Sequence, residues 1–441
     1  DDPQYKVVTE KGKRGRQIHT DIETFFHLSQ PQFCGQCHDV NLPTGFRLEE
    51  AFSEYKASPA AERGETCQDC HMGIVPGKVS GYKNGPAAIV GGKETPSRKL
   101  TNHMFIGPDY SIIHPGIFPH NPDAEDMASL EEWLQFDWEA GWGTDAFEDS
   151  LAENVVFPAR WSSVDDRYDA REIINAQLEL LDTANDDRIQ LLRNGFRTTK
   201  VSVDKVDEEE GMDFRVQVFN PTDGHNVPTG FTGERLYYME VTVRDAEDNI
   251  VFQSGNLDPN GDVLNSHSVY VHDGFIEQDL QLFSLQAGFL TRNRRGSERD
   301  AVLPINFSLD PLPFLRPSRT PAILDARPGD NRLHKPTLTP LEKRWVPYHV
   351  DAELLTGKAP YNLTVRLFAQ MVPVNLVVAI QDVGFDYNMS TQEVIDRLVA
   401  GKVMLEESRI DMATLGVTEQ NHAYLAEYEG KAQATELVSA K

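Results

Sequence analysis

Cysteine is scarce in this sequence, with four residues in 441, and long apolar runs are missing. A bilayer-spanning helix needs about 20 consecutive apolar residues, so no transmembrane segment is predicted. Cations are also few, because 42 Lys and Arg face 69 Asp and Glu, for a formal net charge of -27. This balance argues against nucleic acid as a partner, since phosphate binding requires clustered cations. A basic protein partner, a saline habitat, bound divalent cations or simple solubility would each fit the charge.

No secretory signal peptide is visible in the first residues. The start, Asp1-Asp2-Pro3-Gln4, is typical of a mature end after processing or of an internal start within a longer product. The length predicts two or three domains at about 150 residues each. A hydrophobic content of 39% is enough for real cores, which argues against general disorder.

All four cysteines fall in two Cys-x-x-Cys-His units, Cys34 to His38 and Cys67 to His71. Structural disulfides are disfavoured, because cysteines three positions apart rarely bridge comfortably. A zinc ribbon usually separates its two knuckles by about 15–20 residues, whereas 29 residues (38–66) separate Cys37 from Cys67 here. A thioredoxin-like pair needs one Cys-x-x-Cys near a βαβ pattern, and two copies in a loop-rich stretch do not match it.

The spacing favours covalent attachment of haem. Cysteines at i and i+3 lie on one side of a helical turn, so each sulfur can add to one of the two vinyl groups of a porphyrin. The next residue, histidine, is carried beneath the ring, where its imidazole can bind iron. Histidine makes up 13 of 441 residues, so its occurrence after both units by chance has odds of about one in a thousand.

The sequence therefore predicts two covalently attached haem c groups. The predicted attachment and proximal ligand residues are Cys34, Cys37, Cys67, Cys70, His38 and His71. Attachment of this kind happens outside the bacterial cytoplasm, so a periplasmic or extracellular location is expected.

Each iron has a second axial position. The candidates for it are His27, His103 and His225, with His19 and Met104 as weaker alternatives. His225 lies in "GHNVPTG", where glycines and a proline define a rigid loop that suits a ligand held in one pose. His103 follows the second motif, and His27 precedes Cys34 by seven residues. Two histidines on each iron predict low-spin, low-potential haems.

Hydrophobic periodicity divides the chain into four parts and predicts an α+β fold. The parts are a loop-rich and partly helical di-haem domain (1–125), a helical segment (126–197), an antiparallel β-sandwich domain (198–385), and a C-terminal helix and tail (386–441). Within them, Gly195 is a natural helix stop, and Ser390 with Glu393 forms a capping box.

One acidic stretch, "LDPNGD", places Asp258, Asn260 and Asp262 at alternate positions. This is half of a calcium loop, but the distant bidentate Glu is missing. A plain Asn-Gly turn is favoured, so a calcium site has only weak support.

These residues resemble the multihaem c-type cytochromes of respiratory bacteria. The resemblance lies in "HLSQPQFCGQCHDVNLPTGFRLEEAFSEYKASPAAERGETCQDCHM" and, more loosely, in "NPTDGHNVPTGFTGERLYYMEVTV", which is similar to the β-domain that follows the haem segment in many of them. In that family a Gly-His-x-x-Pro-Thr-Gly loop and an Asn-His-x-Phe-x-Gly segment supply distal ligands, which implies His225 and His103. A histidine ahead of the first Cys implies His27.

Such proteins commonly carry more than two haems, with the extra sites upstream. A surplus distal histidine is therefore expected to serve a haem on another chain or on an amino-terminal piece.

Three classes of function fit the sequence. The first is electron transfer between redox partners that present a basic docking face, or along an assembly with further haem-bearing chains. The second is a haem enzyme, such as a di-haem peroxidase or small-oxyanion reductase, which needs one open iron. The third is a structural or adhesive subunit of an extracellular assembly. The many well-placed histidines favour electron transfer, and no Ser-His-Asp, phosphate-loop or HExxH pattern supports a hydrolase or nucleotide enzyme.

Overall fold

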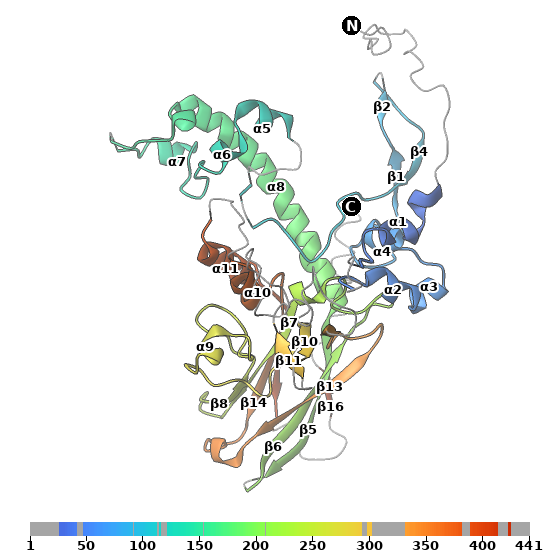
Figure 1. Cartoon of the computed structure of the whole chain (residues 1–441), viewed down its shortest axis with the longest axis vertical. Coiled ribbons are helices and arrows are strands. Elements are labelled where there is room, and N and C mark those ends of the chain that lie inside the picture. Colours follow the sequence, from blue (N-terminus) through green and yellow to red (C-terminus); the bar gives the residue numbers. More distant parts are fainter. Residues whose placement is uncertain are drawn as a thin grey trace.

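The computed structural model describes residues 26–41, 47–90, 92–112, 114–115, 121–152, 154–207, 209–292, 298–301, 331–381, 389–412 and 422–424. Over these residues the chain combines helices with antiparallel sheets, which confirms the predicted α+β class. Figure 1 shows a lobe of short helices, a second helical lobe, and a sheet lobe, with one long helix running between the last two.

The two Cys-x-x-Cys-His units lie in the first of these, called here the motif lobe. Its helices are α1 (Pro31–Gly35), α2 (Ala51–Lys56), α3 (Pro59–Glu62) and α4 (Cys67–His71). Its strands are β1 (Lys83–Pro86), β2 (Ile89–Val90), β3 (Lys93–Glu94) and β4 (Ser97–Leu100), which pair β1 with β4 and β2 with β3. The lobe is built from pieces of one or two turns, so it depends on what packs against it.

The second lobe is helical. Its helices are α5 (Pro122–Met127), α6 (Leu130–Trp133), α7 (Asp145–Glu148) and α8 (Val164–Gly195). Helix α8 has 32 residues, about 48 Å at 1.5 Å per residue, and it carries the chain from this lobe to the sheets (Figure 1). It ends at Gly195, the predicted stop. On the single turn of α6, Trp133 is buried, whereas Leu130 is 53% exposed.

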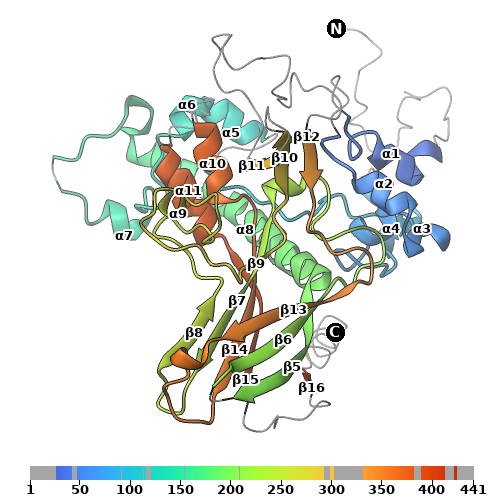
Figure 2. The same ribbon diagram turned by 60° about the horizontal axis from the view of Figure 1, so that its bottom comes forward.

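The sheet lobe contains two antiparallel sheets that face each other, seen from another side in Figure 2. The first sheet has the order β13 (Lys343–Val350), β6 (Gly211–Phe219), β5 (Arg197–Asp207) and β16 (His422–Tyr424). The second has the order β15 (Val403–Asp411), β14 (Asn362–Gln370), β7 (Leu236–Arg244) and β8 (Ile250–Ser254), with β9 (Phe283–Ser284) also paired to β7. A separate small sheet has the order β11 (Glu298–Ala301), β10 (Gly288–Arg292) and β12 (Asn331–His334).

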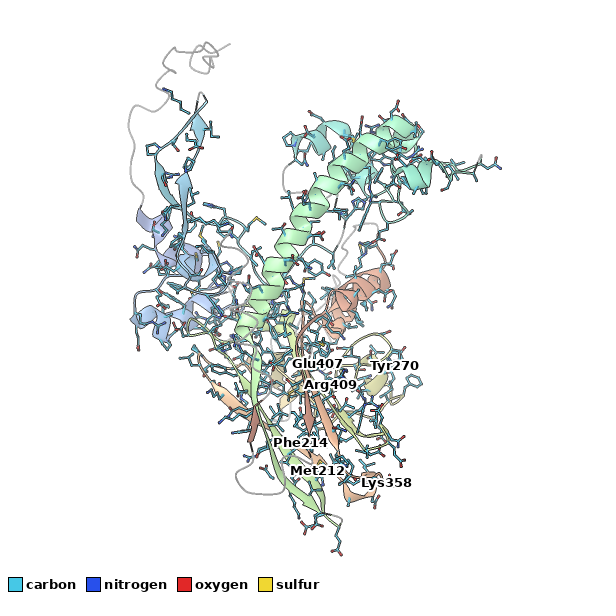
Figure 3. All side chains as sticks on the ribbon, turned by 180° about the vertical axis from the view of Figure 1, so that it is seen from behind. Met212, Phe214, Tyr270, Lys358, Glu407 and Arg409 are labelled. Carbon is cyan, nitrogen blue, oxygen red and sulfur yellow. The ribbon has the colours of Figure 1, made fainter. Side chains whose placement is uncertain are left out.

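The sandwich core follows from the alternation of the strands. Phe214, Val216 and Val218 alternate along β6 and are fully buried. Figure 3 labels Phe214 and its buried neighbour Met212 on the same strand. These side chains share one apolar cluster with residues of β7, β14 and β15, so the core joins the two sheets.

Beyond the second sheet, α10 (Val374–Ile380) packs against α11 (Thr391–Ala400). Helix α11 begins with the predicted capping box, in which Ser390 and Glu393 exchange hydrogen bonds. The chain then returns to the sandwich as β15, a strand that was not predicted. The outer face of β15 carries charges, and Glu407 accepts hydrogen bonds from Arg366 and Arg409; Figure 3 labels Glu407 and Arg409.

The "LDPNGD" stretch forms a turn, as favoured. The Asp258 carboxylate accepts hydrogen bonds from the backbone N–H groups of Asn260 (2.8 Å) and Asp262 (3.0 Å). Within the described ranges, no three His, Cys, Asp or Glu side chains converge as a metal site, so calcium gains no support. None of the described helices has both the length and the apolar character to cross a membrane.

Candidate functional site

The second motif is shaped by a capping box. The Thr66 side chain accepts a hydrogen bond from the Asp69 N–H, and the Asp69 carboxylate accepts one from the Thr66 N–H at 2.8 Å. The Tyr82 hydroxyl also donates to Asp69, at 2.6 Å. This cap stabilises a helix of only five residues, α4, that would be marginal alone. It places Cys67 and Cys70 one turn apart, as haem attachment requires.

The first motif forms a similar turn. Helix α1 has Pro31 at its first position, and the N–H groups of Cys37 and His38 both donate to the Cys34 carbonyl, at 3.1 and 3.0 Å. Gly35 between the cysteines lies against the ring of Phe52 on α2. A Cβ at Gly35 would lie 2.5 Å from that ring, so glycine permits α2 to pack on the motif.

Although 33 residues apart in sequence, the two motifs meet in space. Gln68, between the cysteines of the second motif, donates to the carbonyls of Leu28 and Gln30, both at 3.0 Å. The thiols of Cys34 and Cys67 form a hydrogen bond, which lowers the pKa of Cys34 to about 6 and raises the pKa of Cys67. The first cysteines of the two units therefore face each other.

Both motifs open onto one cavity of about 550 Å³ between the motif lobe, the end of α8 and the loop that follows β6. The wall on the motif side includes Cys34, His38, Cys67, Cys70 and His71. Burial raises the pKa of the Cys70 thiol to about 12. This volume lies within the range of about 300–1,000 Å³ that is usual for small-molecule and cofactor sites.

The described cysteines have neither the geometry of a disulfide nor that of a zinc ribbon. None of the four cysteines, all of which are described, forms a disulfide. They do not gather as the ligand set of a zinc ribbon either, since the described residues contain no such cluster.

His71 and His225 both line the cavity. Their ring centroids are 6.2 Å apart and their planes are inclined by 16°. A metal–imidazole bond is about 2.0 Å long, and a ring centroid lies about 1.1 Å from its coordinating nitrogen. Two rings that bind one iron from opposite sides therefore have centroids about 6 Å apart. The separation in the structure fits this arrangement.

The second ring nitrogens of this pair are also occupied as ligation requires. His225 Nδ1 donates to the Asn226 carbonyl at 2.8 Å, and the His71 ring hydrogen bonds to the Ile106 backbone. Metal-binding histidines typically donate their other N–H to a carbonyl, which fixes the tautomer and the ring orientation. Burial, and next the nearby His225, lower the pKa of His71 to about 4, so its imidazole is neutral and able to bind a metal.

His38 lies in a different environment. Its side chain is 64% exposed, and its Nδ1 is 3.0 Å from Glu49 Oε1, which leaves Nε2 as the ligating atom. Within the described part of the chain, no second imidazole ring is paired with His38 as His225 is with His71. The described structure thus pairs the imidazoles of His71 and His225 and gives His38 a carboxylate partner, Glu49.

The other described candidates, His27, His103 and Met104, do not line the cavity. His27 precedes α1, and its Nε2 accepts a hydrogen bond from Gln36 at 2.8 Å. His103 is exposed next to Phe105, and Met104 is 47% exposed. His19 lies outside the described residues. The assignment of His27 and His103 as ligands stays a prediction.

Several residues that hold the site were not predicted. Asn220 is fully buried, and its Nδ2 donates to the carbonyls of His225, Leu338 and Thr339, each at 3.1 Å. The turn sequence "NPTDG" was the available signal for it. Glu54 on α2 accepts hydrogen bonds from the His225 loop, a contact across 172 residues that no local pattern reveals.

No family model matches the chain, and no curated protein matches it. Among solved structures, the chain is similar to a penta-heme cytochrome c552 from Thermochromatium tepidum, with a TM-score of 0.40 and 14% sequence identity. The match covers 87% of this chain and 56% of that chain, so this chain spans little more than half of its length. A TM-score this low does not establish a shared fold.

Proposed function

We propose that this protein is a multihaem c-type cytochrome that attaches two haem c groups and transfers electrons. The observation that carries the proposal is the His71–His225 pair, 6.2 Å apart across a cavity that three motif cysteines line. Haem c supplies a one-electron iron couple when it is bound. The chain supplies the tethers, the axial ligands and the buried environment that set the properties of that couple.

The residues divide between two sites. At the first, Cys67 and Cys70 are the tethers, with His71 as the proximal ligand and His225 as the distal one. The backbone carbonyls of Ile106 and Asn226 orient the two imidazoles. Because both ligands are histidines, this site is expected to be low-spin and of low potential.

At the second site, Cys34 and Cys37 are the tethers and His38 is the proximal ligand, oriented by Glu49. The hydrogen bond between the thiols of Cys34 and Cys67 supports close approach of the two sites. Electrons would therefore cross between neighbouring groups held by one short lobe.

The exposure of His38 favours a second candidate function. If no residue binds the opposite face of that iron, the site is open to a small molecule, as in a di-haem peroxidase or a small-oxyanion reductase. A surplus histidine, His27 or His103, would close such a site on another chain and support self-assembly. Peroxide or oxyanion turnover separates the enzyme from the carrier.

The charge of the chain points to the kind of partner. A net charge of -27 favours a redox protein with a basic docking face, and association of that kind weakens as salt rises. Covalent attachment of haem also implies export, so we propose a periplasmic or extracellular location.

Potentiometric titration of the haem-loaded protein, followed by visible and electron paramagnetic resonance spectra, tests the proposal. We expect two reversible one-electron transitions, with a low-spin signal from the His71 site. Reduction by a small basic redox protein should slow several-fold as ionic strength rises from about 0.01 to 0.15 M. Protein that carries haem yet shows no reversible transition would contradict electron transfer.

A further inference from the structure

The loop from His225 to Gly230, called here the ligand loop, is held by a carboxylate from the motif lobe. Glu54 lies on α2, and its side chain is 8% exposed. Its Oε2 accepts hydrogen bonds from the Asn226 N–H at 3.2 Å and from the Thr229 hydroxyl at 2.5 Å. One carboxylate oxygen therefore binds the loop on both sides of its Val227-Pro228 centre.

These contacts continue to the imidazole of His225. Asn226 donates its N–H to Glu54 and accepts, through its carbonyl, the hydrogen bond from His225 Nδ1. Displacement of Asn226 would therefore rotate the His225 ring. Asn220 holds the same loop from the sandwich side, by donating to the His225 carbonyl. Glu54 holds the loop from the lobe that carries His71.

A lysine balances the charge of this carboxylate. Lys335, which follows β12, places its Nζ 3.8 Å from Glu54 Oε1 and 3.2 Å from Glu50 Oε2. Its side chain is 15% exposed. Charges that are this far removed from water interact more strongly with each other, and with a neighbouring metal, than surface charges do.

We propose that Glu54 is a positioning residue that holds His225 against His71. We further propose that Glu54 and Lys335 act as opposing charges on the iron that these two histidines bind. This inference rests on the proposed function, since it concerns the site of that iron. A negative charge favours ferric iron and a positive charge favours ferrous iron. The two side chains should therefore move the potential in opposite directions.

Single substitutions can separate the positioning of the ligand loop from the effect of the charges on Glu54 and Lys335. Glu54→Gln removes the charge and weakens the loop contacts, whereas Thr229→Val removes one contact and keeps the charge. Lys335→Gln removes the opposing charge. Glu50→Gln is the matched control, because Glu50 contacts the same lysine from the same helix region and makes no hydrogen bond to the ligand loop in the described structure.

The first measurement is carbon monoxide binding to the fully reduced, haem-loaded protein. Carbon monoxide binds the iron of an opposed His pair only after the distal histidine leaves, so its rate reports release of His225. We expect Glu54→Gln and Thr229→Val to bind it about tenfold faster than wild type, as the loss of a charge-assisted hydrogen bond implies. Glu50→Gln should stay within about twofold of wild type.

The second measurement is the midpoint potential of the same site. It should rise in Glu54→Gln, fall in Lys335→Gln, and remain close to wild type in Thr229→Val. Equal carbon monoxide rates in Glu54→Gln, Thr229→Val and Glu50→Gln would overturn the positioning role. Potentials that move in the same direction in Glu54→Gln and Lys335→Gln would overturn the charge role. Both results require attached haem, so they differ from failure of the proposed function, in which no haem is attached.

Discussion

The ring of His71, at the end of one Cys-x-x-Cys-His unit, lies 6.2 Å from the ring of His225, which is 154 residues further along the chain. The first belongs to the motif lobe and the second to a loop of the sandwich. Docking of the two lobes therefore creates the pair. If the pair binds iron, binding also ties the two lobes together.

Replacement of the distal histidine should change the spin state of one iron only. We expect His225→Ala, in haem-loaded protein, to convert the low-spin signal of the His71 site to high-spin. His225→Met should raise one midpoint potential, because a thioether ligand favours the reduced iron. The control is His272→Ala, since His272 is 78% exposed on α9 (Val269–His272). An unchanged spectrum in His225→Ala would remove His225 from the site.

Haem attachment should also stabilise the docking of the lobes. We expect the wild-type protein to unfold in one transition, and the variant Cys67→Ser/Cys70→Ser to release the motif lobe at lower urea concentration. The physical reason is that the lobe is made of helices of four to six residues, which depend on tertiary contacts. Limited proteolysis with mass analysis measures this, and equal cleavage of both proteins would contradict it.

The helical lobe depends on a buried ion pair. Arg167 and Glu148 are 4% and 5% exposed, and the guanidinium donates to both carboxylate oxygens. Glu148→Gln should cost about 3–5 kcal/mol of unfolding free energy, because it leaves a buried cation without its partner. Glu139→Gln is the control, since Glu139 is 61% exposed and 3.9 Å from Arg397, and it should cost less than about 1 kcal/mol. Urea unfolding measures both, and equal effects would contradict burial as the cause.

The same pair should make stability fall in acid. The hydrogen bond from Arg167 lowers the pKa of Glu148 below its ordinary value. A lowered folded-state pKa contributes stability above the unfolded pKa, and this contribution is lost as pH falls through the folded value. The fall between about pH 5 and 3 should be smaller in Glu148→Gln than in wild type.

A buried carboxyl should have the opposite effect near neutrality. Burial, and then the charge of Asp258, raise the pKa of Asp262 to about 7. The folded state thus keeps a proton that the unfolded state releases, so stability is full below about pH 4 and falls as pH rises to about 7. The loss is of the order of 4 kcal/mol at 1.36 kcal/mol per pKa unit.

Asp262→Asn keeps an acceptor for Asn375, which donates to Asp262 at 3.2 Å. Unfolding free energies measured from pH 4 to 8 should therefore vary less in this variant than in wild type. Asp248→Asn is the control, because the Asp248 side chain is 87% exposed and should leave the profile unchanged. Equal unfolding free energies of wild type at pH 4 and pH 8, after correction for the separate loss of stability in acid, would contradict a role of Asp262.

Regular alternation made part of the fold predictable. Alternate side chains are buried on β14, such as Val365, and Phe214, Val216 and Val218 follow the same alternation on β6, whereas β7 is buried on both faces. Helix α8 and the cap of α11 were identified for similarly local reasons. Strand β15 was missed because adjacent glutamates, Glu406 and Glu407, interrupt its alternation, and they are satisfied by contacts with Thr198 and Arg366 on other strands.

The site was predictable in its parts and not in its assembly. The two motifs and His225 stand out from local spacing and loop chemistry. The match of His225 to His71, rather than to His38, depends on how the lobes dock. Glu54 looks like an ordinary surface acid in the sequence, because its function lies in contacts with Asn226 and Thr229.

The most direct test is the haem content of the purified chain, measured by pyridine haemochrome absorbance together with intact mass. Two covalent haem c groups per chain are expected, with no cysteine left to react with a thiol reagent. Colourless protein with four reactive thiols, or with its cysteines bound to zinc, would contradict it.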